Sequence, residues 1–422
     1  MKKKISYTSH FPMYALSLMS FFPLLNIKGV SISVILCLLL SVIYFAVNFR
    51  GNWKPDLKSL LITSTPFVLY LLGMIYTDDF KEGIKVLETG LPLLIFPFIY
   101  FILLGKNYFI SLKNINKVQN LLVLSSSLLI TIVLFYIVIT GVWTDLFDDE
   151  IMLKASRNQG KNMIREAIQQ IPFLGEHPTY FGLLSVITFI ISIFRIAFDK
   201  KYIFVISLVL GFLGILVSGS KMAILSFLVS IFLIAILKIR KKRNIVIFIF
   251  LTILVSTLLV KNNSFLKNRF KEIIITKLEA PRGTNYNSTN VRLAILQCSL
   301  GTFSTAPILG QGTGGYKLDM VECFKNFDTD IFERHQYYFN THNQYFSFAL
   351  YFGVIGLLVF LLWLGAFAKV FLKNREVLFL VLLLVFLLMF LTENILERQT
   401  GVILFSILMP LYYKYSLQLN EK

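Results

Sequence analysis

The chain has 422 residues, of which 56% are hydrophobic and only 15% are charged, and its formal net charge is +18 at pH 7. This composition excludes a soluble globular domain, whose residues are about 25% charged. It predicts an all-α integral membrane protein.

Apolar runs long enough to cross a membrane recur along the whole chain. A membrane-spanning helix needs about 20 apolar residues to cover roughly 30 Å of hydrocarbon. The runs predict twelve spans, of which the fourth is interrupted by prolines. In chain order the expected helices cover residues 11–26, 32–49, 59–76, 90–104, 120–140, 179–198, 202–218, 222–237, 244–260, 344–368, 376–392 and 402–416.

The basic residues indicate which way these helices face. With the N-terminal KKK in the cytoplasm, the cytoplasmic segments hold 22 of the 41 Lys and Arg residues but only four of the 23 Asp and Glu residues. Cytoplasmic loops of membrane proteins carry such an excess. Topology therefore accounts for the whole net charge, and nucleic-acid binding is not expected. The first apolar segment lacks a small-residue cleavage site, so it is expected to remain as a helix, with both termini cytoplasmic.

Two outer connections are too long to be simple turns, and long ordered loops tend to carry function. They divide the chain into nine spans over residues 1–260, with a shorter outer loop at about 141–178, a large outer loop over 261–343, and three spans over 344–422. The shorter loop contains RNQGKNMIREAIQQIPF, whose helical spacing of apolar residues predicts a short helix lying on the membrane surface. The residues at that spacing are Met163, Ile164, Ala167, Ile168 and Ile171.

The large outer loop carries two cysteines and a glycine-rich stretch, LGQGTGGY. An oxidising compartment would permit a disulfide between Cys298 and Cys323, and two free buried thiols are the alternative. A nucleotide-binding fingerprint would need a strand before the glycines and a helix after them in a cytosolic site. A tight turn is therefore the better interpretation of the glycines.

Polar residues that are distant in sequence are all predicted at the outer rim of the bilayer. They are His177 in GEHPTYFG, Lys221 in VSGSKMAIL, Arg292 in STNVRLAIL, His342 and Asn343 in NTHNQYF, and Glu393 with Arg398 in LTENILERQTG. Cations beside a histidine suit an anionic substrate. Structural alternatives stay open, because the histidines could cap helices, Arg292 could anchor a lipid phosphate, Lys221 could snorkel, and Glu393 could pair with Arg398.

These stretches carry a resemblance to the O-antigen ligase and polymerase superfamily. HNQYFSFALYFGVIGLL resembles its signature, in which a histidine followed by Asn or Ser begins a helix with a later G-x-x-G. Arg292 with the downstream PILGQGTGGY is similar to the outer-loop arginine and glycine-rich turn of the family, and SGSKMAIL resembles its S-G-S-R-G-A segment. HPTYFGLL and LTENILERQTGVILF are similar to further stretches, so that the resemblance spans roughly residues 175–410.

Two positions depart from the family pattern. Lys221 stands where the family usually has arginine, which keeps the charge but loses the planar fork that fits phosphate. Leu296 stands where a tryptophan is common.

The resemblance implies a multi-pass glycosyltransferase of the bacterial inner membrane, with the large loop and the active site on the periplasmic side. Its donor would be a glycan on undecaprenyl diphosphate, and its acceptor the lipid A core for a ligase or a lipid-linked glycan for a polymerase, in contact with membrane lipids. No metal or other cofactor is expected. His342 would be the general base of an inverting displacement and Arg292 the second catalytic residue. Substrate contacts are expected from Lys221, His177, Asn343, Arg398 and Glu393.

A transporter of lipid-linked oligosaccharide is the rival class of function. Transporters usually place ionisable residues and broken helices near the bilayer midplane. Here the charges collect at the outer rim, which favours an enzyme. Ligase is placed slightly ahead of polymerase, since the shared motifs do not separate the two.

Overall fold

The computed structural model describes residues 11–48, 53–143, 163–238, 279–283 and 286–420, together with the isolated positions 257, 261 and 267. Within these ranges the chain is helical throughout, with a single isolated β-bridge between Gly283 and Thr329. This confirms the all-α class. The predicted span 244–260 and the acidic stretch DLFDDE lie outside the described ranges.

Six helices of the described ranges are long and apolar enough to cross a membrane, and each coincides with a predicted span. They are α2 (Ile27–Asn48), α7 (Leu112–Ile139), α10 (Pro178–Ala197), α12 (Lys221–Lys238), α18 (Gln344–Lys373) and α20 (Gln399–Leu419). Two shorter apolar helices, α11 (Val205–Ser218) and α19 (Val377–Met389), coincide with two more predicted spans. A multi-pass membrane protein is supported, while the full count of twelve spans stays a prediction.

Two other predicted spans are broken in the structure, and a third begins at a bend. Residues 11–26 form α1 (Phe11–Met19) and a short 3₁₀ turn, Phe22–Leu24, and residues 59–76 fall within α3 (Leu57–Thr63) and α4 (Thr65–Gly73). The predicted fourth span, 90–104, corresponds to α6 (Pro92–Pro97) with its π-helical extension Phe98–Leu103, and a bend of 42° separates it from the preceding helix α5 (Phe80–Gly90). A proline lies at or close to each break, where its missing N–H and its ring disfavour a continuous helix. Hydropathy alone cannot register these breaks.

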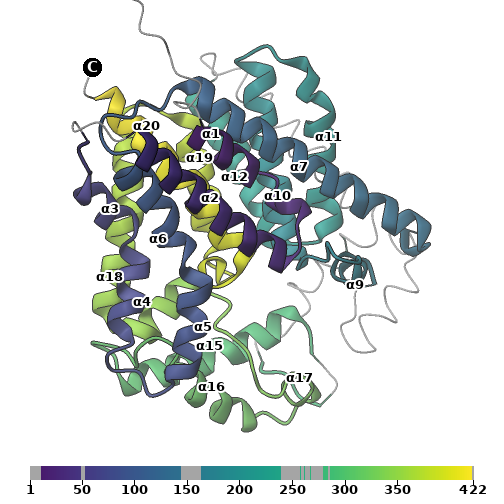
Figure 1. Cartoon of the computed structure of the whole chain (residues 1–422). Coiled ribbons are helices and arrows are strands. Elements are labelled where there is room, and N and C mark those ends of the chain that lie inside the picture. The colour runs from purple at the N-terminus through teal and green to yellow at the C-terminus, as the bar shows by residue number, and fades with distance from the viewer. Residues whose placement is uncertain are drawn as a thin grey trace, which may run out of the picture.

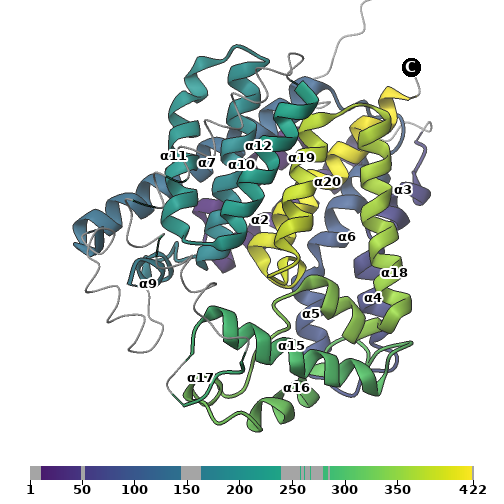
Figure 2. The same cartoon turned by 180° about the vertical axis from the view of Figure 1, so that it is seen from behind.

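Segments predicted for the same side of the membrane lie together in space. α15 (Ser288–Thr305), α16 (Tyr316–Lys325) and α17 (Asp330–Arg334) gather at one end of the bundle, and the C-terminus lies at the other (Figures 1 and 2). At the C-terminal end the Ile110 amide donates to the Gln418 side chain at 3.0 Å, and Asn374 Nδ2 donates to the Ser416 carbonyl at 3.0 Å. These connections all belong to the predicted cytoplasmic side.

Buried charges lie close to helix ends. Among the described residues the buried charged side chains are Glu82, Arg195, Glu393 and Lys414. Lys414, near the end of α20, donates to the carbonyls of Tyr100 and Gly105, the latter at 2.6 Å, where a helix end leaves carbonyls without intrahelical partners. Arg195 in the last turn of α10 donates to Gln119 and pairs with Asp199. These two cations therefore have structural partners.

The short helix predicted in the first outer loop is confirmed as α9 (Met163–Gln170). Its residues Ile164, Ala167 and Ile168 are buried, and the helix packs against α7, α10 and α11. The expectation that this apolar face lies on the membrane surface is therefore corrected. Helical spacing reveals an apolar face but does not distinguish protein from lipid as its cover.

The glycine-rich turn fastens the outer loop to a break in α18. Gly353 has φ 64° and ψ −163° inside α18, which frees the carbonyls of Leu350 and Tyr351 from the helix. These carbonyls accept hydrogen bonds from the amides of Gln311 and Gly312, each at 2.9 Å. The glycine-rich stretch LGQGTGGY and the G-x-x-G of α18 are thus in contact with each other. This contact supports the interpretation of LGQGTGGY as a tight turn.

A disulfide between Cys298 in α15 and Cys323 in α16 joins two helices of the outer loop, with the Cα atoms 5.7 Å apart. Closing a loop with a sequence separation of 25 residues is expected to stabilise the fold by about 3 kcal/mol. Changing both cysteines to alanine should therefore lower the apparent unfolding temperature of the detergent-purified protein. A reductant should lower that temperature for the wild type and leave the double variant unaffected. Equal temperatures for wild type and variant would contradict this prediction.

Candidate active site

The start of α18 separates the roles of two neighbouring residues. Asn343 is the N-cap of the helix, because its Oδ1 accepts from the Phe346 amide at 3.1 Å. Its Nδ2 also donates to the Leu391 carbonyl at 3.1 Å, which joins α18 to the turn before α20. The cap interpretation therefore applies to Asn343 and not to His342.

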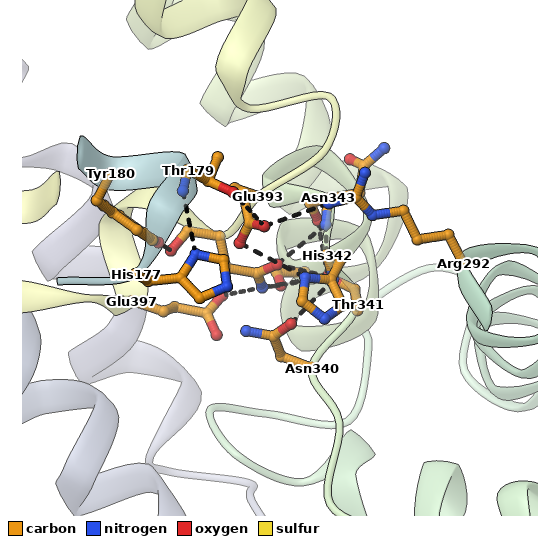
Figure 3. Close-up of polar contacts among 12 residues, drawn as sticks. His177, Thr179, Tyr180, Arg292, Asn340, Thr341, His342, Asn343, Glu393 and Glu397 are labelled. Atoms are coloured by element: carbon orange, nitrogen blue, oxygen red, sulfur yellow. Dashed lines mark hydrogen bonds and ion pairs between the residues drawn. The ribbon is translucent and has the colours of Figure 1, made fainter. Parts of the chain in front are cut away.

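His342 is held in a strained backbone conformation with its ring toward Glu393. Its φ is 45°, in the left-handed region that non-glycine residues seldom adopt. Its amide donates to Asn340 Oδ1 at 3.1 Å, and its Nδ1 lies 3.5 Å from Glu393 Oε2 (Figure 3). The side chain is 24% exposed, so part of it remains accessible. Strain of this kind is concentrated at functional sites.

Glu393 is the centre of the cluster. Its side chain is only 3% exposed, and Oε1 lies 3.3 Å from Arg292 Nη2 and 3.5 Å from the Thr179 hydroxyl. Burial alone would raise the pKa of this carboxyl, but the interaction with His342 and the nearby Arg292 guanidinium hold the pKa well below its usual range. Glu393 is thus a buried carboxylate with partners on several sides, as a buried charge requires.

Asn394, next to Glu393, fixes the turn that carries His342. Its Oδ1 accepts from the Asn343 amide at 2.9 Å, and its Nδ2 donates to Thr341 Oγ1 at 3.1 Å and to Glu397 Oε1 at 3.0 Å. This asparagine lies in the stretch LTENILERQTG but has no predicted role. The sequence feature that could have indicated a role is its position beside Glu393, shortly before an apolar helix begins.

His177 is the N-cap of α10 and stands on the other side of Glu393 from His342 (Figure 3). Its Nδ1 accepts from the Thr179 amide at 3.4 Å. Burial lowers the pKa of His177 to about 3, and the positive charges of Arg165 and Arg398 act in the same direction. The ring is therefore neutral near pH 7 and acts as an acceptor, so its cap role is established by geometry.

Arg292 approaches Glu393 from α15. A capping box formed by Asn287 and Asn290 begins this helix and sets Arg292 on its first turns. Thr289 lies three residues earlier, so it shares a face with Arg292. Lys221 Nζ donates to Thr289 Oγ1 at 3.2 Å. Lys221 at the start of α12 thus reaches the helix face that carries Arg292.

A third cation, Arg165 of α9, lies beside Lys221. α11 ends at Gly219, whose φ is 54°, and the last carbonyls of the helix need partners from elsewhere. Arg165 Nη1 donates to the carbonyls of Ser218 and Gly219 at 3.2 and 3.3 Å. Arg165 is not among the residues predicted for the site, because nothing in the helical pattern of α9 shows where its polar face points.

Arg398 lies outside this chain of contacts. Its guanidinium stands 5.6 Å from the centre of the Tyr180 ring, a cation–π geometry. The alternative pairing of Glu393 with Arg398 is wrong, since Glu393 pairs with Arg292 and His342 instead.

The structure thus joins four residues predicted from separate segments through direct contacts or through Thr179: His342, Glu393, Arg292 and His177. Lys221 contacts α15, the helix that carries Arg292, at Thr289. An imidazole whose Nδ1 faces a carboxylate can accept a proton at Nε2, and neighbouring cations can hold an anion. Among the described residues no group of three or more His, Cys, Asp or Glu is placed to hold a metal ion.

Comparison with known families supports the resemblance found in the sequence. Residues 206–361 match a family model described as O-Antigen ligase. The matched stretch includes Lys221, Arg292 and His342, and it runs from α11 into α18. No curated protein matched the chain. The match confirms the resemblance to the O-antigen ligase superfamily over this part of the chain.

Proposed function

We propose that the protein is an O-antigen ligase-like glycosyltransferase that moves a glycan from undecaprenyl diphosphate to a hydroxyl of the lipid A core. The contact of His342 with the buried Glu393, beside Arg292, carries this proposal. His342 and Arg292 lie within the stretch that matches the O-Antigen ligase model, residues 206–361, and Glu393 lies beyond its end. A polymerase that joins lipid-linked repeat units would use the same chemistry, and it is the second candidate because the same family match accommodates it.

His342 acts as the general base. With the Nδ1 proton directed to Glu393, the lone pair of Nε2 accepts the proton of the acceptor hydroxyl. The hydroxyl oxygen then bonds to the anomeric carbon, and the bond from that carbon to the diphosphate breaks with its electron pair on the departing oxygen. Direct displacement inverts the anomeric configuration. The diphosphate already supplies the leaving group, so the protein has to supply a base and positive charge.

Glu393 positions His342. A substrate contact is the expectation from the sequence, but the 3% exposure of this side chain and the partners of both its oxygens favour a role through the imidazole. The carboxylate orients the ring and stabilises the imidazolium that forms when the proton arrives, as the acidic member of a catalytic triad does.

Arg292 and Lys221 hold the diphosphate. They come from α15 and α12, and Lys221 contacts α15 at Thr289, one turn before Arg292, so positive charge is supplied by two adjoining helices. Charge-assisted hydrogen bonds are roughly twice as strong as neutral ones, and the charge on the leaving oxygen grows as the bond breaks. Arg165 adds a third positive charge beside Lys221, in a cluster where arginine forks suit phosphate.

The arrangement supports an inner-membrane protein with cytoplasmic termini and a periplasmic active site. Arg292 belongs to α15, which lies at the end of the bundle opposite the C-terminus (Figure 2). Lys414 and Arg195 belong to the predicted cytoplasmic helix ends, where local partners bind them. Charged residues near helix ends favour an enzyme over a transporter, which would place them at the midplane.

A reconstituted transfer assay tests the function. The purified protein is placed in nanodiscs with an undecaprenyl-diphosphate-linked glycan, with or without lipid A core. Glycan bound to the core establishes a ligase, and lengthened lipid-linked glycan without core establishes a polymerase. Movement of unchanged donor across a vesicle membrane, with no new glycosidic bond in either assay, would overturn the proposal in favour of transport.

Arg292→Ala is expected to lower kcat/KM for the donor by about 10- to 150-fold, which corresponds to the loss of one charge-assisted hydrogen bond of about 1.5–3 kcal/mol. Arg292→Lys should recover part of this loss, since it keeps the charge without the planar fork. Lys221→Arg is the matched control and should retain activity, because the family usually has arginine there. Unchanged donor kinetics in Arg292→Ala would show that this side chain is only a structural partner of Glu393.

A further inference from the structure

A cavity of about 480 Å³ opens beside the proposed site, and none of the predicted site residues lines it. Its walls come from the turn between α1 and α2, the connection from α9 to α10, and the start of α20. Glu176 in its wall directly precedes His177, so the cavity and the catalytic cluster share a boundary. Its volume falls in the range of about 300–1,000 Å³ that is usual for small-ligand sites.

One wall of the cavity presents hydrogen-bonding groups. The Glu176 carboxylate accepts from the His177 amide at 2.8 Å and from the Thr400 hydroxyl. The amide side chains of Gln169 and Asn26 lie along the same cavity. Carboxylates accept hydrogen bonds, hydroxyls and amides both donate and accept, and sugar hydroxyls need partners of both kinds.

The rim of the cavity adds an aromatic surface. The Phe173 side chain is 85% exposed, and its backbone φ of 65° is rare for a bulky residue. Phe22, which is buried, also belongs to the lining. An exposed aromatic face beside amides and a carboxylate suits the apolar face of a sugar ring.

We propose that this cavity binds the carbohydrate part of the acceptor and presents its hydroxyl to His342 past His177. This inference rests on the proposed glycan transfer and adds the place of the second substrate. The donor and the acceptor then approach the His342–Glu393 pair from different sides. Figure 3 shows Arg292 reaching Glu393 from one side, with His177 on the other.

The lining argues against the other two ligands that the reaction supplies. A lipid tail needs a wholly apolar channel, whereas Glu176, Thr400 and Gln169 place polar groups among the apolar residues of this lining. A diphosphate needs several cations, whereas Lys28 is the single lysine or arginine in the lining. The cations proposed for diphosphate lie on α12 and α15, which do not contribute to this cavity.

The kinetic test uses two exposed residues of the cavity, Phe173 and Gln169. Phe173→Ala and Gln169→Ala are each expected to raise KM for the acceptor about tenfold, through loss of a stacking contact or a hydrogen bond. KM for the donor should stay unchanged. Tyr202→Ala is the matched control, because Tyr202 is also an exposed aromatic residue but does not line the cavity. This variant should leave both KM values unchanged. An unchanged acceptor KM in both cavity variants would overturn the inference.

A binding measurement separates this inference from the proposed function. Tritiated core oligosaccharide released from lipid A is titrated onto the full protein in nanodiscs. Wild type and His342→Ala should bind it equally, and Phe173→Ala about tenfold more weakly. Binding that depends on Phe173 without any transfer by the wild type would support the cavity and contradict the function. Transfer by a wild type that binds only the lipid-anchored acceptor, and not the free saccharide, would contradict the cavity.

Discussion

His342→Ala is expected to lower the rate of glycan transfer by about 10²–10⁴-fold, the usual contribution of a general base. The variant should fold normally, because Asn343 and not His342 caps α18, and because the His342 side chain is 24% exposed. The measurement is kcat in nanodiscs at saturating donor and acceptor, with surface lipopolysaccharide from a complemented deletion strain as the cellular readout. A normal ladder at normal expression would show that the imidazole is not the base.

Asn343→Ala is the matched control for this result. It removes the cap and should cost about 1 kcal/mol of stability, with a lower unfolding temperature. Its kcat per folded molecule should stay far above that of His342→Ala. A similar loss of kcat in both variants would mean that the position of the helix, rather than the imidazole, controls the rate.

Glu393→Gln is expected to lower kcat by about 10²-fold or more, because the amide keeps the size of the side chain but removes the charge that orients the base and stabilises its protonated form. Removing the carboxylate of Glu393 should lower kcat only through its effect on His342. The double variant His342→Ala with Glu393→Gln should therefore be no slower than His342→Ala alone. This non-additivity is the measurement that identifies a positioning role.

Two results would contradict that role. Fully multiplied losses in the double variant would mean that Glu393 acts independently of the histidine, for instance on substrate. A loss of Glu393→Gln activity explained wholly by a lower folded fraction would reduce Glu393 to a structural partner of Arg292. Glu393→Asp provides the conservative comparison, because it keeps the charge and shortens the reach of the carboxylate.

Much of the fold follows from local sequence. Apolar runs predicted the six span-length helices that the structure describes, because insertion depends on hydropathy summed along a single segment. The same sum misses the breaks near Pro23 and Pro66, where backbone geometry and not hydropathy ends the helix. It also misses the burial of α9, because the sequence of an apolar helix face does not show whether lipid or protein covers it.

The sequence by itself determined the kind of protein and its resemblance to the O-antigen ligase superfamily, and it predicted a set of polar residues at the outer rim that includes His342 and Arg292. Only the tertiary structure decided which of these residues are partners. In the structure Asn343 caps α18, and the Arg398 guanidinium lies over the Tyr180 ring. Glu393 is the buried residue that contacts both His342 and Arg292. Asn394 and Arg165 are neighbours of the site that were not predicted. The physical reason is that a charge near the membrane rim is encoded locally, whereas its partner depends on which turn of a distant helix faces it.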